Sequence, residues 1–199
     1  MTLVEKKFIL IITFLIIVTV SYSQSYLGLT TKEANLREEP NKTSEVLDKL
    51  KYNSQLFVYS NEATDDYYNV IDIATDQEGW IHKSLVKLIK PLPKSAESLF
   101  TADEKINSSD CTVTVKNNTS LSVTLKLNSN YYYFDAQETK TLTMTPASYQ
   151  YVASAPSVIP YFGDDTLLSG YSYSWTFYIE TSYTGGVKYN YSTKRKRKN

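Results

Sequence analysis

From residue 34 onward, the chain consists of short runs in which apolar and polar residues alternate, separated by clusters of turn-forming residues. Successive side chains of a β-strand point to opposite faces, so this period of two predicts strands with one buried face. The longest run places Tyr171, Tyr173, Trp175, Phe177 and Ile179 on one face. The chain also contains 18 tyrosines, and aromatic residues favour strands. The pattern predicts an all-β protein.

Two blocks of such strands are separated by a segment that begins with Pro91 and Pro93, which interrupt strand pairing. The first block, residues 26–90, has about five short strands and is expected to close into a small barrel. The second, residues 109–183, has six or seven and is expected to form an antiparallel β-sandwich. We expect residues 91–108 to be a linker with at most one short helix, over Ala96–Ile106. Residues 184–199 are predicted to be a disordered basic tail.

The N-terminus has the organisation of a secretory signal peptide. Lys6 and Lys7 precede a run of apolar residues and threonine from Phe8 to Val20, and small residues follow up to Ser23. The run is shorter than the ~20 residues that a membrane-spanning helix needs. We therefore expect residues 1–23 to be removed and the protein to be exported, to the periplasm, the cell surface or the medium. The alternative is that the segment is retained as an anchor.

Charge is balanced overall, with 21 basic and 21 acidic side chains. Five of the basic residues lie together in Lys194–Lys198, so the rest of the chain is mildly acidic and lacks the basic surface of a nucleic-acid-binding protein. The tail is expected to be solvated, or at most to make non-specific contacts with an anionic surface. A single cysteine, Cys111, excludes an intrachain disulfide, and its place in an alternating run predicts a buried apolar role.

The sequence predicts no catalytic residue, metal site or cofactor. His82 is the only histidine and lies in a different block from Cys111, so a nucleophile–base pair has no obvious members. Asp164 and Asp165 are two adjacent acids, too few oxygens for a calcium loop, and are interpreted as a polar turn. A hydrolase site in the second block is kept as a remote alternative.

A series of spaced signals runs through the first block. They are Asn35-Leu36-Arg37-Glu38-Glu39-Pro40, Ser44-Glu45-Val46, Leu56-Phe57-Val58, Tyr67-Tyr68-Asn69-Val70 and Gly79-Trp80-Ile81-His82. Over about residues 26–90 this order resembles the bacterial SH3 (SH3b) domain. Three positions depart from the family pattern: Glu39 and Asn53 stand where glycine is usual, and Tyr67 where tryptophan is usual. Glutamate tolerates positive φ poorly, so the loop around Pro40 is expected to differ from the family shape.

The resemblance implies a peptide-like ligand, because SH3-like domains dock extended peptides in grooves lined by aromatic residues. A cell-wall peptide is one such ligand. The candidate groove residues are Tyr67, Trp80, Pro40 and Tyr59, and ordinary packing is the alternative for each ring. In the second block, Tyr131, Tyr132 and Tyr133 place rings on both faces of one strand and are a candidate interface.

These features predict an exported, non-enzymatic binding or adaptor protein. Its expected partners are a cell-wall peptide or an envelope protein, with no specific nucleic acid and no transmembrane segment after signal cleavage. The alternative is a structural or protein-interaction subunit of an exported assembly that uses the tyrosine-rich sandwich.

Overall fold

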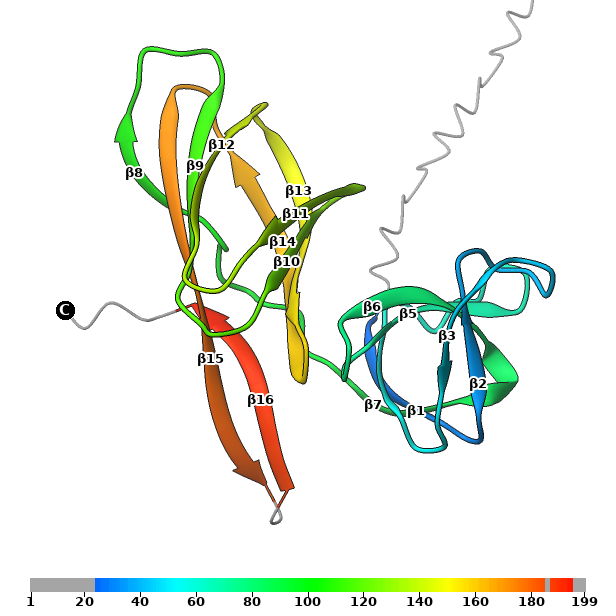
Figure 1. Cartoon of the computed structure of the whole chain (residues 1–199). Coiled ribbons are helices and arrows are strands. Elements are labelled where there is room, and N and C mark those ends of the chain that lie inside the picture. The colour runs from blue at the N-terminus through cyan, green and yellow to red at the C-terminus, as the bar shows by residue number, and fades with distance from the viewer. Residues whose placement is uncertain (1–23, 185–186, 195–199) are drawn as a thin grey trace, which may run out of the picture.

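The computed structural model describes residues 24–184 and 187–194, with side chains for residues 24–179. The predicted signal peptide and the end of the basic tail, residues 195–199, lie outside the described residues. The fold is all-β, as predicted, with an N-terminal barrel and a C-terminal two-layered unit (Figure 1). In the described ranges, no helix has the length and apolarity to cross a membrane.

The N-terminal unit is a seven-stranded sheet that curls on itself, in the order β3-β2-β6-β5-β4-β1-β7. Its elements are β1 (Tyr26–Thr30), β2 (Ala34–Arg37), β3 (Val46–Leu50), β4 (Gln55–Val58), β5 (Tyr67–Asp72), β6 (Gln77–His82), the 3₁₀ turn η1 (Lys83–Leu85) and β7 (Val86–Pro91). Alternate residues of these strands, among them Leu36, Val70 and Ile81, are fully buried inside the barrel. Their burial follows the period of two that the sequence displays.

Two backbone positions set the shape of the barrel. Asn53 adopts φ 66° in the turn between β3 and β4, which asparagine accepts readily. A Cβ at Gly79 would lie 2.7 Å from the carbonyl oxygen of Arg37, so only glycine lets β6 approach β2 this closely. Glu39 is not among the residues with positive φ. The backbone there is therefore not left-handed, so glutamate is accommodated without that strain, and the expected difference of the Pro40 loop from the family shape stays a prediction.

The expected linker is not a free spacer, and the proposed helix is absent. Leu92 is buried at the end of β7, and Leu99 and Phe100 are buried in the core of the second unit. The strand β8 (Thr101–Lys105) then pairs with the antiparallel strand β15. The helix prediction was wrong. Leu99 and Phe100 pack into the core of the C-terminal unit, and the main-chain pairing of β8 with β15 holds this segment beside that core.

The C-terminal unit has two facing layers joined through one path of strands, β11-β10-β13-β14-β16-β15-β9-β12, with β8 beside β15. Its further strands are β9 (Cys111–Asn117), β10 (Val123–Leu127), β11 (Asn130–Phe134), β12 (Thr139–Met144), β13 (Ala147–Ala155), β14 (Val158–Leu167), β15 (Tyr171–Thr184) and β16 (Val187–Lys194). Most pairs are antiparallel, as expected of a sandwich, but β9 runs parallel to β15 and β14 runs parallel to β16. The alternation of apolar and polar residues within a strand does not indicate which strand it pairs with, or whether the pair is parallel or antiparallel.

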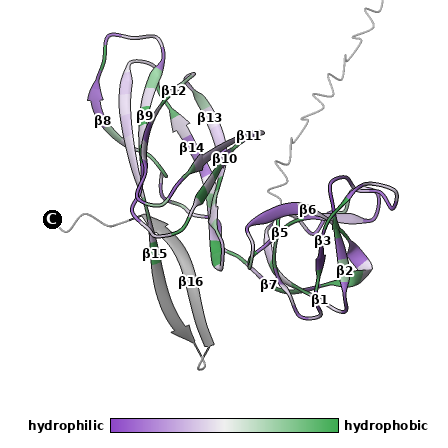
Figure 2. Cartoon of the chain, viewed as in Figure 1, coloured by the Kyte–Doolittle hydropathy of each residue, from purple (hydrophilic) through white to green (hydrophobic). Residues whose placement is uncertain are grey.

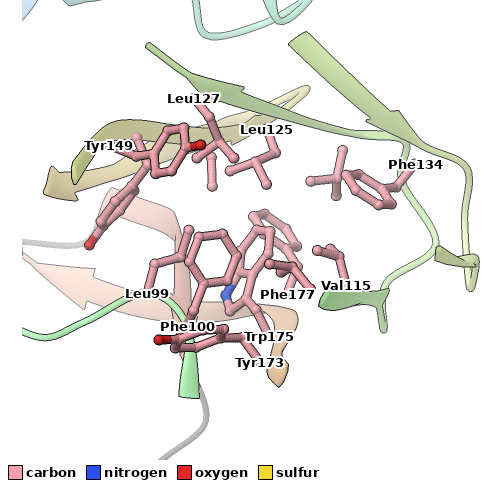
Figure 3. Close-up of a cluster of buried hydrophobic side chains, with 14 of the residues drawn as sticks. Leu99, Phe100, Val115, Leu125, Leu127, Phe134, Tyr149, Tyr173, Trp175 and Phe177 are labelled. Carbon is pink, nitrogen blue, oxygen red and sulfur yellow. The ribbon is translucent and has the colours of Figure 1, made fainter. Parts of the chain in front are cut away.

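The core of this unit lies between the two layers (Figure 3). Trp175 and Phe177 of β15 pack edge to face, with ring centroids 5.6 Å apart, and Val115 of β9 lies beside them. Leu125 and Leu127 of β10 enter from the opposite layer. The alternating run from Tyr171 to Ile179 therefore supplies the centre of the core.

Two predicted irregular segments are strands. Residues around Asp164 and Asp165, interpreted as a turn, lie in β14. A Cβ added at the neighbouring Gly163 would lie 2.6 Å from the Tyr151 hydroxyl, so this strand passes close to the Tyr151 ring. Residues 187–194, predicted to be disordered, form β16, which pairs with the end of β15. In both cases main-chain pairing to a long neighbouring strand outweighs a polar or basic composition.

Candidate functional site

The two units meet along an apolar seam. Phe57 and Ile71, on the outer face of the barrel, are buried with Ile159 of β14, and the rings of Phe57 and Phe162 lie 5.1 Å apart. Figure 2 shows that the end of the β13–β14 hairpin facing the barrel is hydrophobic. The amide of Ser157 in that hairpin donates to the carbonyl oxygen of Ile73 at 2.6 Å. The seam fixes the position of β10 and β11 relative to β6.

Beside the seam, Glu78 of β6 gathers four hydrogen-bond donors from both units. Its Oε2 accepts from the Tyr59 hydroxyl at 2.9 Å and the Tyr131 hydroxyl at 3.1 Å. Its Oε1 accepts from Asn69 Nδ2 at 3.2 Å and from Lys126 Nζ at 2.6 Å. A carboxylate with this many donors is well satisfied despite being partly removed from water.

Lys126 links this cluster to two aromatic rings. Its ammonium lies 4.7 Å from the ring centroid of Tyr59 and 5.0 Å from that of Tyr131, within the range of a cation–π interaction. Burial works to lower the pKa of Lys126, but the hydrogen bonds with Glu78 and Tyr131 outweigh it and the pKa is raised. Burial, reinforced by Glu78, also raises the pKa of Tyr59 well above its usual value. Lys126 and Tyr59 therefore keep their neutral-pH protonation states, a charged ammonium and a neutral phenol.

Asp76 is the second acid at the junction. Its Oδ2 accepts from the Thr124 hydroxyl of β10 at 2.8 Å, whereas its buried Oδ1 has no hydrogen-bond partner. Burial raises the pKa of Asp76, and the hydrogen bonds from Ser154 and Thr124 oppose the rise only in part. A carboxylate in this setting is costly to ionise.

These groups surround a cleft of about 350 Å³ between the two units. Its lining comes from both domains and consists of Tyr59, Ile71, Asp76, Gln77, Glu78, Thr124, Lys126, Tyr131, Tyr133, Val152 and Ser154. Tyr131 and Tyr133 lie at its rim, 42% and 66% exposed, with ring planes within 10° of parallel. A concave site with aromatic walls and a few polar groups suits a binding function.

Of the residues singled out in the sequence, the structure therefore brings Tyr59, Tyr131 and Tyr133 together. Tyr132 is not with them, because it lies on the opposite face of β11 and packs against the core of the C-terminal unit. This division follows from the alternation of side chains along one strand.

Trp80 and Tyr67 lie on the same outer face of the barrel as Tyr59 but away from the cleft. In the sheet, Trp80 pairs with Asn69 on one side and Arg37 on the other, and Tyr67 pairs with His82. Tyr67 is buried, with its ring 5.2 Å from the His82 ring, whereas Trp80 is half-buried. Pro40 lies in the loop after β2, three residues beyond Arg37.

The remaining chemically notable side chains have structural partners. His82 Nδ1 lies 2.8 Å from Ser84 Oγ and caps η1. Cys111 is fully buried, donates to the carbonyl oxygen of Leu168 at 3.0 Å, and has a pKa raised by burial. Asp165 accepts from the Phe100 amide at 2.7 Å, and Asp164 pairs with Lys94. Among the described residues, no three potential metal-ligating side chains cluster.

Comparison with protein families agrees with the shape of the barrel. The model of the bacterial SH3 domain matches residues 32–87. The N-terminal unit is therefore a bacterial SH3 domain, a class of binding module often found in exported and cell-wall-associated proteins. Searches of curated proteins and of solved structures gave no match.

Sequence reasoning missed Asp76, Glu78 and Lys126. Asp76 and Glu78 lie in a polar stretch that looks solvated, and Lys126 lies on the polar face of an alternating strand, 48 residues from Glu78. One signal was available for Glu78, since it alternates with the buried Gly79 and so must share the outer face with Trp80. Its meeting with Lys126 depends on how the two domains pack.

Proposed function

We propose that this protein is an exported, non-enzymatic binding protein that takes a peptide of the cell wall along the outer face of its SH3 domain. The proposal rests chiefly on the continuity of that face with the interdomain cleft. From Trp80, the strands lead through Asn69 to Tyr59, and Tyr59 lines the cleft. An extended ligand on this path would contact aromatic rings along its length, as SH3-like domains require.

Export is part of the proposal and is supported by the sequence of residues 1–23, together with the frequent occurrence of bacterial SH3 domains in exported proteins. A non-enzymatic role is supported by the partners of the reactive side chains. His82, Cys111 and the paired acids of β14 each serve packing, capping or an ion pair.

Wall binding is tested by incubating the chain from Gln24 onward with purified sacculi and measuring the protein that sediments with them. We expect retention of the unsubstituted protein and at least a severalfold loss for Trp80→Ala. Tyr52→Ala is the matched control, because Tyr52 is 72% exposed and lies in the turn before β4, outside the proposed path. Retention of the unsubstituted protein no greater than that of an unrelated protein would reject the proposal.

A second candidate is a protein-interaction subunit of an exported assembly. The observation in its favour is the pair of exposed rings of Tyr131 and Tyr133 on a strand at the end of the sheet path. Crosslinking in the envelope followed by mass analysis separates the two candidates, since an assembly subunit is captured on protein and a wall-binding protein on sacculi.

A further inference from the structure

The strand β11 ends the sheet of the C-terminal unit. In the described part of the chain it pairs with β10 and with no second strand. Edge strands of this kind present main-chain donors and acceptors to any extended chain that comes beside them. Natural proteins often cover such an edge, so one that no described strand pairs with, next to a cleft, is informative.

The register shows which residues of β11 present those groups. Leu127 and Asn130 flank a two-residue turn and so form a hydrogen-bonded pair, as do the pairs at every second position, including Leu125 with Tyr132. The main-chain groups of Tyr131 and Tyr133 therefore point away from β10. One contact confirms this direction: Lys140 Nζ, from β12, reaches the carbonyl oxygen of Tyr133 at 2.8 Å.

The same two residues carry the exposed rings at the rim of the interdomain cleft. A chain added to β11 would place every second side chain next to these rings and over the cleft. Strand addition uses two elements, main-chain bonds for affinity and pockets for alternate side chains for specificity. Both are present here, side by side.

We propose that β11 binds an extended segment of another protein by strand addition, with the alternate side chains of that segment resting on Tyr131 and Tyr133 in the cleft. A protein segment fits this edge better than a wall peptide does. Regular pairing requires a run of L-residues, whose side chains alternate between faces, and each D-residue in a wall peptide reverses that alternation. This interaction goes beyond wall binding by the SH3 domain and stands independently of it.

Two substitutions at one position isolate the main-chain contribution. Tyr133→Ala removes the ring and keeps the outward N–H, whereas Tyr133→Pro removes both and leaves the bonds to β10 intact. The probe is a short blocked peptide of alternating threonine and valine, with a second version N-methylated at every residue, so that neither of its edges can donate. Binding is measured by calorimetry on the chain from Gln24 onward, with circular dichroism to verify that each variant is folded.

We expect the plain peptide to bind, Tyr133→Pro to bind it about tenfold more weakly than Tyr133→Ala, and full N-methylation of the peptide to abolish binding. Lys140→Ala, which frees the carbonyl oxygen of Tyr133, is expected to strengthen binding. The proposal is overturned by failure of the plain peptide to bind at millimolar concentration, by equal binding of the two Tyr133 variants, or by equal binding of both N-methylated and plain peptides. Sacculus retention is scored separately, so either proposal can fail alone.

Discussion

The two ends of the outer face of the SH3 domain differ in how far the second unit covers them. At one end, Phe57 and Ile71 are covered by the β13–β14 hairpin, and Glu78 is bound by Lys126 of the second unit. At the other end, Trp80 and Pro40 are only half-buried and do not line the cleft. One sheet face thus serves both as a domain interface and as a candidate ligand surface. Outward-facing residues of the same strands therefore become either interface or candidate ligand-binding residues, depending on whether the second unit packs on them.

The largest effect is expected at the covered end. Phe57→Ala removes a fully buried ring from the seam and should lower the free energy of unfolding by about 3–5 kcal/mol. Trp80→Ala, at the open end of the same face, should cost clearly less because its ring is only half-buried. Urea denaturation of both variants measures the difference. Equal losses would mean that the two ends do not differ in packing.

The next effect concerns the polar cluster. Lys126→Met leaves Glu78 partly buried without its cation, and we expect a loss of about 2 kcal/mol, since the two side chains are only 17% and 21% exposed. Lys83→Met is the matched control, because the Lys83–Asp66 pair is 49% and 63% exposed and should contribute far less to stability. A double-mutant cycle of Lys126→Met with Glu78→Gln gives the coupling free energy between the two side chains. A coupling free energy as small as that of the exposed Lys83–Asp66 pair would contradict a stabilising role for the Lys126–Glu78 pair.

A smaller effect, dependent on pH, is expected at Asp76. Burial raises its pKa in the folded state, so this group contributes most stability when it is protonated, and the contribution is lost as the pH rises through the raised pKa. Asp76→Asn removes the ionisation and suits the backbone, because φ is 64° there and asparagine accepts this region. We expect the variant to be the more stable by about 1 kcal/mol near pH 7, with the difference shrinking towards pH 4. Thermal unfolding of both proteins across this range measures it, and a difference independent of pH would refute the explanation.

Much of the fold was accessible from the sequence because it depends on local alternation. The runs around Val113, Leu125, Tyr151 and Trp175 gave the strands and their buried faces, and the spaced signals from Asn35 to Gly79 gave the SH3 barrel. The failures share one cause. Residues 101–105, 158–167 and 187–194 are strands because a neighbouring strand pairs with them. The partner of the first lies far along the chain and the other two close hairpins, and in all three the composition of the segment itself leaves little trace of the pairing.

The candidate site divides in the same way. Tyr59, Tyr131 and Tyr133 were identified as exposed aromatic residues without any indication that they meet. Their partners Glu78, Lys126 and Asp76 come together only because Phe57, Ile71 and Ile159 bury the seam and bring β6 beside β10. Contacts between domains are the part of a structure that local patterns describe least.

We propose that the outer face of the SH3 domain and the interdomain cleft form one binding surface. NMR chemical-shift mapping of the isotope-labelled chain from Gln24 onward, titrated with a soluble digest of cell wall, tests it most directly. We expect shifts at Trp80 and Asn69 that continue to Tyr59 and Glu78, with Tyr52 unaffected. Shifts confined to residues away from this path, or no shifts at all, would contradict it.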